Sequence, residues 1–330
     1  MLTLLALIYA KIADARNRLY ERGVFDSFDL GSRTISIGNI TTGGTGKTPL
    51  VAYIARVLAE RGEKVCILTR GYGRENPKQR VLVSDGEQVF ASVREAGDEP
   101  FELAQKLIGK AIVIADADRV AAAEWARAKF GVTAFVLDDG FQHRRAKRDL
   151  DIVCIDAVRP FGGGKMLPAG HLREPLENLE RADVIVITRA DLVHNIRDVS
   201  DKIAEFAPEA IVFTGHNRIV RIASLDGRSE LAMNTPSFAF CGLGNPDNFF
   251  ERLRHNEINV TDTMAFPDHH IYIQKDVVDL EKLARETQAE ALVTTAKDAV
   301  KLLNLKFEFP LYVVEIEMKI DDADAFSALL

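Results

Sequence analysis

The sequence predicts an α/β fold in which a parallel sheet has helices on both faces, with a smaller α/β domain at the C-terminal end. Three observations predict this class. Up to Phe213, short β-branched runs alternate with helical stretches, as in successive βαβ units. Most of these runs are almost continuously apolar, which is typical of strands covered on both faces. Beyond Phe213 the alternation changes, which indicates a second unit.

The predicted elements of the first domain alternate between strand and helix. Strands are expected at residues 33–38, 64–69, 111–116, 134–139, 151–156 and 183–188. Helices are expected at residues 47–61 and 119–129. A β-hairpin over residues 80–92 interrupts this order, and its turn is predicted at Asp85-Gly86.

A short β linker is predicted to join the two domains, because residues 217–231 have the pattern of a strand, a turn and a weak strand. Residues 236–250 follow as strand, tight turn and helix, with Pro246 near the helix start. Residues 291–303 repeat that order. A final strand at residues 310–318 can return to the linker.

Length and composition describe a folded chain with two domains. The 330 residues exceed the usual ~150 residues of one domain, and we predict domains at residues 1–215 and 216–330. The net charge of −7 argues against a general nucleic-acid-binding protein, which is usually basic. The three cysteines, Cys66, Cys154 and Cys241, lie in apolar strand-like runs, so we expect reduced core thiols in a cytosolic protein. The sequence leaves the oligomeric state open.

The first 23 residues predict an amphipathic helix. The opening apolar run is too short to span a bilayer, which takes ~20 apolar residues. Basic residues follow this run, whereas in a secretory signal they precede it. One helical stripe is apolar and consists of Met1, Leu5, Ile8, Ile12, Ala15 and Leu19. The pattern fits either a helix at a membrane interface or a helix packed on its own domain.

A glycine-rich stretch, TTGGTGKT, lies between a predicted strand and a predicted helix, as a phosphate-binding loop requires. Its glycines allow backbone N–H groups to point at phosphate oxygens, Lys47 adds a point charge, and the helix N-terminus favours anions. Position 41 holds threonine where the general pattern has glycine. We predict a phosphate-loop NTPase-like domain that binds nucleotide through Thr41, Thr42, Gly43, Gly44, Thr45, Gly46, Lys47 and Thr48.

A pair of acids, Asp138 and Asp139, ends the predicted strand AFVLDD. Ligands of parallel α/β sheets bind at the carboxyl ends of the strands. Carboxylates together with the hydroxyl of Thr48 and phosphate oxygens suit Mg²⁺. The sequence therefore predicts a magnesium site at Thr48, Asp138 and Asp139, and leaves open which aspartate contacts the metal directly.

These stretches, together with TRGYGR, GDEP, LDDGFQHR, GHLREP, FPDHH and TTAKDAVKL, resemble the tetraacyldisaccharide 4′-kinase family of lipid A biosynthesis. The resemblance runs from about residue 35 to residue 303, and threonine at position 41 is usual in it. It implies transfer of the ATP γ-phosphate to the 4′-hydroxyl of a tetraacylated glucosamine disaccharide 1-phosphate, giving lipid IVA. It also implies a peripheral protein at the cytoplasmic face of the bacterial inner membrane, which favours the interfacial role of the N-terminal helix.

Three residues are expected to have catalytic roles, Lys47 from the chemistry of the phosphate loop and the other two from the resemblance. Lys47 would stabilise the transferring phosphate, Asp98 of GDEP would act as base, and His269 of FPDHH would orient Asp98. His270 is an alternative to His269, and Asp98 can also serve as the N-cap of the helix that follows it.

Further residues of the shared motifs are candidates for binding the lipid substrate. They are Arg70, Tyr72, His143, Arg173 and Glu174. Arginine suits the acceptor phosphate because its fork matches phosphate oxygens. Arg74 is equally consistent with a surface ion pair. The basic run 143–148 fits phosphate or anionic-lipid attraction, or a solvated face.

Two other functions are consistent with parts of the chain. TRAD, at residues 188–191, occupies the place of a guanine-reading N-K-x-D, although Thr188 and Arg189 differ from the required asparagine and lysine. The loop also resembles that of ParA-type membrane scaffold ATPases, although Thr42 replaces the first lysine of their motif. A GTPase switch and a scaffold ATPase are therefore the alternatives to the kinase.

Overall fold

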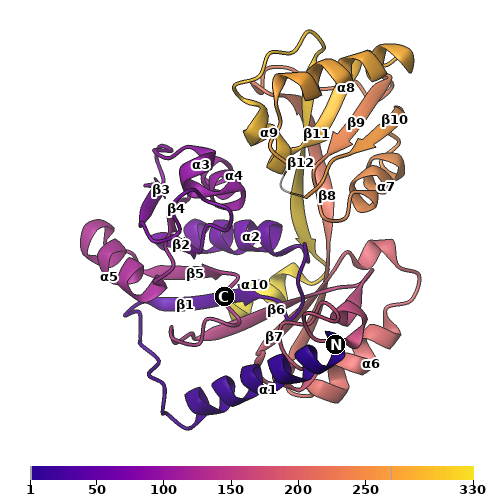
Figure 1. The fold of residues 1–330 in the computed structure, drawn as a ribbon. Coiled ribbons are helices and arrows are strands. Elements are labelled where there is room, and N and C mark those ends of the chain that lie inside the picture. Colours follow the sequence, from indigo (N-terminus) through magenta and orange to yellow (C-terminus); the bar gives the residue numbers. More distant parts are fainter. Residues whose placement is uncertain (1, 269) are drawn as a thin grey trace. The chain divides into compact units, whose positions relative to one another are not determined.

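The computed structural model describes residues 2–268 and 270–330 (Figure 1). It contains two compact units. The first comprises Met1–Asn217 and Met318–Leu330, and the second comprises Arg218–Glu317. The division into domains at residues 215 and 216 stays a prediction.

The first unit contains the predicted parallel sheet. Its strands lie in the order β8-β7-β6-β1-β5-β2-β4-β3. The bounds are β1 (Arg33–Gly38), β2 (Val65–Thr69), β3 (Val81–Ser84), β4 (Ala111–Ala115), β5 (Ala134–Asp138), β6 (Leu150–Asp156), β7 (Val184–Thr188) and β8 (Ile211–Ser224). The pairings from β8 to β4 are parallel, and β3 is antiparallel to β4. All six strands predicted for this domain are confirmed.

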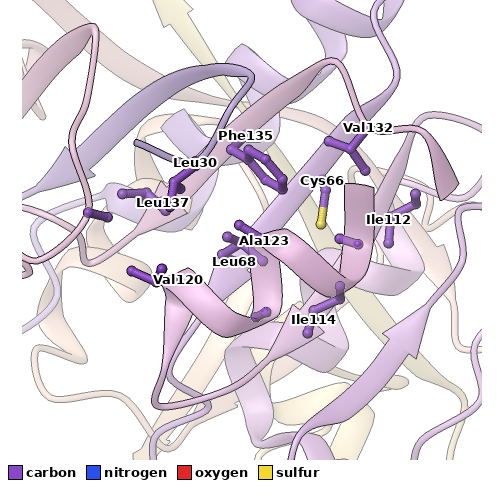
Figure 2. Close-up of a cluster of buried hydrophobic side chains, with 13 residues drawn as sticks. Leu30, Cys66, Leu68, Ile112, Ile114, Val120, Ala123, Val132, Phe135 and Leu137 are labelled. Atoms are coloured by element: carbon purple, nitrogen blue, oxygen red, sulfur yellow. The ribbon is translucent and has the colours of Figure 1, made fainter. Parts of the chain in front are cut away.

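Helices cover this sheet on both faces. They are α1 (Leu2–Glu21), α2 (Lys47–Glu60), α3 (Val93–Ala96), α4 (Asp98–Lys106), α5 (Arg119–Phe130), α6 (Arg197–Phe206) and α10 (Ala323–Leu329), with short 3₁₀ turns η1 (Pro160–Gly164), η2 (Leu176–Arg181) and η3 (Ala190–Leu192). Figure 2 shows α5 packed on one face, where Val120 and Ala123 meet alternate strand residues such as Leu68 and Phe135. Strands β2, β4 and β5 are buried at every residue, as the continuous apolar runs predict.

The predicted hairpin at residues 80–92 is wrong in its second arm. The turn exists, since the Asp85 carboxylate accepts hydrogen bonds from the N–H groups of Glu87 and Gln88. Beyond it only one bridge forms, between Ser84 and Val89. The first arm, β3, pairs instead with β4 and forms the edge of the sheet. The second arm has too few apolar residues to form a full strand on a half-buried surface.

The second unit is a smaller α/β layer with strand order β10-β9-β11-β12-β8. Its elements are β9 (Ser237–Cys241), α7 (Asp247–His255), β10 (Val260–Ala265), α8 (Gln274–Glu286), β11 (Ala291–Thr295), α9 (Ala296–Leu302) and β12 (Leu311–Ile320). The predicted strand–turn–helix order at residues 236–250 and 291–303 is confirmed. β12 lies beside β8, so the return of the last strand to the linker is also confirmed.

The linker itself is simpler than predicted. Its first strand belongs to the long strand β8, and the weak second strand is reduced to one bridge between Ala223 and Glu230. The turn between them contains Asp226, whose carboxylate accepts a hydrogen bond from the N–H of Arg228. The cysteine prediction is confirmed, because Cys66, Cys154 and Cys241 are buried free thiols.

The N-terminal helix exposes most of its apolar side chains. Leu4, Leu7 and Ile12 are each about 60% exposed, whereas Ala6 and Asn17 are buried. The helix is therefore held to the first unit mainly by small and polar residues. Its large apolar side chains, including Leu5 and Ile8 of the predicted stripe, are exposed. Met1, the first residue of the predicted stripe, lies outside the described residues. Within the described chain, no helix combines the length and the apolar character needed to cross a membrane.

Candidate active site

The glycine-rich loop connects β1 to α2 as predicted. Gly46 is the residue before α2 and adopts φ 81°, a left-handed conformation that glycine accepts without strain. The loop is anchored from inside by the amide of the buried Asn39, which donates a hydrogen bond to the hydroxyl oxygen of Thr45 over 2.9 Å. Gly43 and Gly44 are exposed, and added Cβ atoms there would meet nothing within 4 Å. This surface is open to a ligand.

The outer carbonyl groups of the loop are held by β7 and the residue after it. The Thr188 hydroxyl donates to the carbonyl oxygen of Thr45 over 2.8 Å, and the Arg189 guanidinium donates to that of Gly44. Arg189 also forms a buried ion pair with Asp156 at the end of β6, at 3.1 Å. We call these three residues, Asp156, Thr188 and Arg189, the loop tether. Thr188 and Arg189 thus bind the backbone of the loop. This structural role explains why these two positions do not hold the asparagine and lysine of the guanine-reading motif.

The two predicted metal-binding acids lie at the end of β5, beside Lys47. The ammonium of Lys47 is 3.3 Å from the Asp139 carboxylate. Arg173 donates to both oxygens of the same carboxylate, over 2.9 and 2.7 Å. Asp138 is buried and accepts a hydrogen bond from the Thr69 hydroxyl over 2.9 Å. The structure therefore brings together Lys47, Asp138, Asp139 and Arg173 from separate motifs.

The two neighbouring carboxyl groups have opposite electrostatic environments. Burial, with the nearby charges of Glu99 and Asp139, raises the pKa of Asp138 to about 7, and Lys47 opposes this shift. Burial would also raise the pKa of Asp139, but Lys47 and Arg173 together lower it to about 2. One carboxylate is thus already neutralised by cations, and the other lacks a sufficient positive charge.

This donor set fits Mg²⁺. Two carboxylates and the Thr48 hydroxyl, at the second residue of α2, are hard oxygen ligands of the kind that magnesium prefers. The raised pKa of Asp138 indicates a carboxylate that a cation would stabilise in its ionised form. Among the described residues, protein side chains alone form no group of three or more His, Cys, Asp or Glu suited to a metal. A metal here would therefore depend on phosphate oxygens as well.

Asp98 is the first residue of α4 and is half-buried. Its alternative role as N-cap is wrong, because that position belongs to Gly97, with φ 91°. A Cβ at Gly97 would lie 2.7 Å from the carbonyl oxygen of Tyr72, so glycine allows the GDEP and TRGYGR loops to touch. Glu99 of the same motif acts on the pKa of Asp138, which puts GDEP beside the acid pair.

The two histidines of FPDHH belong to the second unit. His269 lies outside the described residues. The imidazole of His270 is 3.0 Å from the Asp276 carboxylate and stacks on Phe266 with 4.6 Å between ring centroids. His270 is therefore held by neighbours of its own unit.

The candidate substrate-binding residues differ in their burial and in their contacts with other residues of the protein. Arg70 is exposed, and Tyr72 is 75% exposed. His143 is partly buried, and burial with the charges of Arg119 and Arg148 lowers its pKa to about 4. The carboxylate of Glu174 is buried and accepts hydrogen bonds from Asn17, Asn178 and Arg181.

The other basic residues considered above have structural partners. Arg74 is neither exposed nor part of a surface ion pair, because its guanidinium is buried and donates to the carbonyl oxygens of Pro77, Gln79 and Ala115. In the basic run, Arg144 pairs with Glu21, Arg145 with Asp118 and Arg148 with Asp151. Three positive charges of the basic run are therefore paired with carboxylates of the first unit.

Several residues at the site could not be recognised from the sequence. Asn39, Thr69 and Arg119 are buried beside the loop or the acid pair, and Arg119 donates to the Asp138 carbonyl oxygen over 3.4 Å. Asn39 and Thr69 have one signal in the sequence, since each is a polar residue at or directly after the end of an apolar strand. Arg119 has no such signal. Asp156 carries the same signal, but its pairing with Arg189 does not follow from it.

Comparison with known proteins gives a consistent result. The family model described as tetraacyldisaccharide-1-P 4′-kinase, LpxK, matches residues 1–330. A protein named tetraacyldisaccharide 4′-kinase from Geobacter metallireducens is 40% identical, over 92% of this chain and 88% of the relative. One of the same name from Halothermothrix orenii is 37% identical, over 97% of this chain and 88% of the relative.

A solved structure is similar over nearly the whole chain. The crystal structure of LpxK from Aquifex aeolicus in complex with ATP has a TM-score of 0.80 and 31% sequence identity. The similarity covers 98% of this chain and 96% of that one. The motif resemblance, the matched family model and the shared fold agree, and the chain belongs to the tetraacyldisaccharide-1-P 4′-kinase family.

Proposed function

We infer that this protein is a tetraacyldisaccharide 4′-kinase, which transfers the γ-phosphate of ATP to the 4′-hydroxyl of tetraacyldisaccharide 1-phosphate and produces lipid IVA. The observation that carries the inference is the family match over residues 1–330. The ATP in the related LpxK crystal structure supports ATP as the donor. The open loop and the acid pair of the first unit suit such a reaction, in which catalysis depends on positioning and charge neutralisation.

The proposed nucleotide site is the loop at residues 41–48. Its exposed glycines leave backbone N–H groups accessible to phosphate oxygens. Lys47, which contacts Asp139, would stabilise the negative charge on the transferring group. Thr48, Asp138 and Asp139 would hold Mg²⁺, which supplies positive charge to the β- and γ-phosphates when bound. Within this assignment, residues 1–215 form the kinase domain and residues 216–330 the smaller domain.

We assign Asp98 as the base that takes the proton of the acceptor hydroxyl, with His269 as its orienting partner. Replacing Asp98 by alanine should reduce kcat by ~10²–10⁴ and change ATP affinity little, because a general base acts on the chemical step. Asp85→Ala, in the exposed turn after β3, is the control. A normal turnover rate in Asp98→Ala would reject this role.

The reaction is tested with purified protein, γ-labelled ATP and disaccharide 1-phosphate acceptors that carry or lack acyl chains. The kinase should transfer label to the tetraacylated acceptor. Sustained ATP hydrolysis without any acceptor would favour the scaffold ATPase instead. Preference for GTP would favour the GTPase, which the contacts of Thr188 and Arg189 with the loop do not suggest.

The acceptor would be met at the cytoplasmic face of the inner membrane, with α1 lying in the interface. The exposed apolar side chains of this helix, among them Leu4, Leu7 and Ile12, support the assignment. Replacing these three residues by serine should move the protein from membrane to soluble fractions and raise the KM for lipid. Unaltered pelleting with membranes would show that another surface anchors the protein.

A further inference from the structure

A basic hollow of about 400 Å³ lies in the first unit, in the segment between β6 and η2. Glycines and Ala169 form much of its wall. Three side chains that can carry positive charge, Arg159, Lys165 and His171, also line it, and no acidic residue does. The name basic hollow refers below to the space between these three residues.

The backbone around the basic hollow requires glycine. Phe161 and the three glycines that follow it all have positive φ angles, between 56° and 78°. A Cβ at Gly162 would lie 2.7 Å from the Cβ of His171, closer than real side chains approach. The absence of a side chain at this position keeps the hollow open and lets the two ends of the segment approach each other.

The segment is fixed to the nucleotide loop on one side. The N–H of Thr42 donates to the carbonyl oxygen of His171 over 2.8 Å, and the Thr42 hydroxyl is 3.2 Å from the imidazole of the same residue. Two residues later, the N–H of Arg173 donates to the carbonyl oxygen of Ile40, and its guanidinium holds Asp139. The basic hollow therefore borders the start of the phosphate loop and is rigidly connected to the acid pair.

The charges of the basic hollow are available to a ligand. Within residues 2–268 and 270–330, neither Arg159 nor Lys165 has an acidic partner within ion-pair distance, and both are exposed. The charge of Arg159 acts against the burial that raises the pKa of Asp156, but that carboxylate already pairs with Arg189 in the loop tether. In a protein with a net charge of −7, an acid-free group of basic side chains beside the active site is a selective place for an anion.

We propose that the basic hollow binds the 1-phosphate of the lipid acceptor, and so selects acceptors that carry this phosphate. The proposal rests on the proposed function. Arg173, the earlier candidate for this phosphate, donates to both oxygens of Asp139 and is thereby directed toward the acid pair. Guanidinium, ammonium and imidazole groups all donate to phosphate oxygens. The volume admits a phosphate together with part of the sugar that bears it.

The test compares two acceptors that differ only at position 1, one with a phosphate and one with a hydroxyl. Arg159→Gln, Lys165→Gln and the double variant are measured beside Lys64→Gln, an exposed lysine before β2. We expect the preference in kcat/KM for the phosphorylated acceptor to fall about tenfold in the double variant, because two charge-assisted contacts are lost. Lys64→Gln should keep the full preference.

Other outcomes overturn the proposal. An equal loss with both acceptors, an unaltered preference, or a rise in the KM for ATP alone would each reject it. Weaker binding to vesicles containing phosphatidylglycerol, with the acceptor preference intact, would assign the basic hollow to phospholipid headgroups instead. Binding of glucosamine 1-phosphate, followed by ³¹P NMR, tests the basic hollow without catalysis, so a failure of the kinase reaction itself remains distinguishable.

Discussion

Each of the two units contains a strand–loop–helix motif with a glycine-rich loop, and the two loops differ in their surroundings. In the first unit, Gly38 at the end of β1 leads through the glycine-rich loop to α2. In the second, β9 leads through Gly242, Leu243 and Gly244 to α7. Both loops follow buried parallel strands, yet only the first leaves its glycines open to a ligand.

The difference lies in what occupies the space next to each loop. An added Cβ at Gly43 or Gly44 would meet nothing within 4 Å. At Gly242 it would lie between 3.1 and 3.2 Å from Asp298, Pro267 and Tyr272. The N–H of Gly242 donates to the Asp298 carboxylate over 3.0 Å. In the second unit, a fully buried carboxylate thus lies against the turn, whereas the first loop is open at its glycines.

This comparison shows that glycine and a strand-to-helix turn do not by themselves make a phosphate site. The first loop also has a lysine at the helix start and outward carbonyl groups that are held by the loop tether. The exposed backbone of Gly43 and Gly44 is therefore left for a ligand. In the second loop the carboxylate of Asp298 accepts the hydrogen bond from the Gly242 N–H, and we interpret this contact as structural.

The largest expected effect is the loss of Lys47. Replacing it by alanine should lower kcat/KM by about 10³, because it removes the positive charge that distinguishes the first loop from the second. Steady-state kinetics of phosphate transfer measure this, with Lys64→Ala as the control. A decrease in kcat/KM of less than threefold would mean that the loop functions without Lys47. The lysine would then not explain the difference between the two glycine-rich loops.

The second prediction concerns the internal anion of the other loop. Asp298→Ala should lower the free energy of unfolding by about 3 kcal/mol, because the Gly242 N–H and the Thr295 hydroxyl lose a buried charged acceptor. Urea denaturation measures this. Asp279→Ala, which removes an exposed partner of Lys275 on α8, should change stability by less than about 0.5 kcal/mol. Equal effects of the two variants would contradict the structural role of Asp298.

The acid pair gives a prediction with a defined pH dependence. The pKa of Asp138 in the folded protein, about 7, lies above its ordinary value of 3.8, so the folded state binds the proton more tightly. The contribution of Asp138 to the stability of the folded state therefore falls as pH rises from about 4 to about 7. At pH 8, without nucleotide and Mg²⁺, Asp138→Asn should raise Tm by about 5 °C, and this gain should vanish toward pH 4.

Asp139→Asn is the matched control, with the opposite sign. The pKa of Asp139 is lowered to about 2, so its carboxylate stabilises the folded state at neutral pH. The variant should be less stable than the wild type at pH 7, and the difference should shrink as pH falls from about 4 toward 2. Calorimetry across this range checks both variants. Shifts of the same sign would refute the opposite environments of the two acids.

The smallest effect is expected at the loop tether. Thr188→Val removes the hydroxyl that donates to the Thr45 carbonyl oxygen, and should weaken ATP binding about fivefold, which corresponds to ~1 kcal/mol. Calorimetric titration with ATP and Mg²⁺ measures this. Thr287→Val removes a comparable hydroxyl on the second unit and serves as the control. Identical ATP affinities would show that the loop holds its shape without Thr188.

The fold could be predicted wherever apolar patterning was strong. The strands that end in Thr69 and Asp138 are apolar almost throughout, and burial on both faces explains why. β10 was not predicted, because its sequence VTDTMA has three consecutive polar residues and its side chains are at most half-buried. α8 was also missed, although its first turn is capped by Asp276, which accepts a hydrogen bond from the N–H of Ile273.

The candidate site was predictable in its motifs and not in its contacts. The stretch GGTGKT and the acid pair were recognised locally, and the structure brings Lys47 to Asp139. The bond from Arg189 to Gly44 joins residues 145 positions apart, and no local pattern encodes such a pairing. The same holds for Gly242 and Asp298, whose hydrogen bond places a carboxylate against a glycine-rich turn.

The hydrogen bond between Asn17 and Glu174 connects α1 to the neighbourhood of the acid pair. Asn17 lies on the buried side of α1, and its amide donates to a carboxylate one residue beyond Arg173, the arginine that holds Asp139. A shift of α1 would therefore reach the acid pair through the peptide unit that joins Arg173 to Glu174. A chain without α1 would lose this support of the acid pair as well as the surface proposed to meet the membrane.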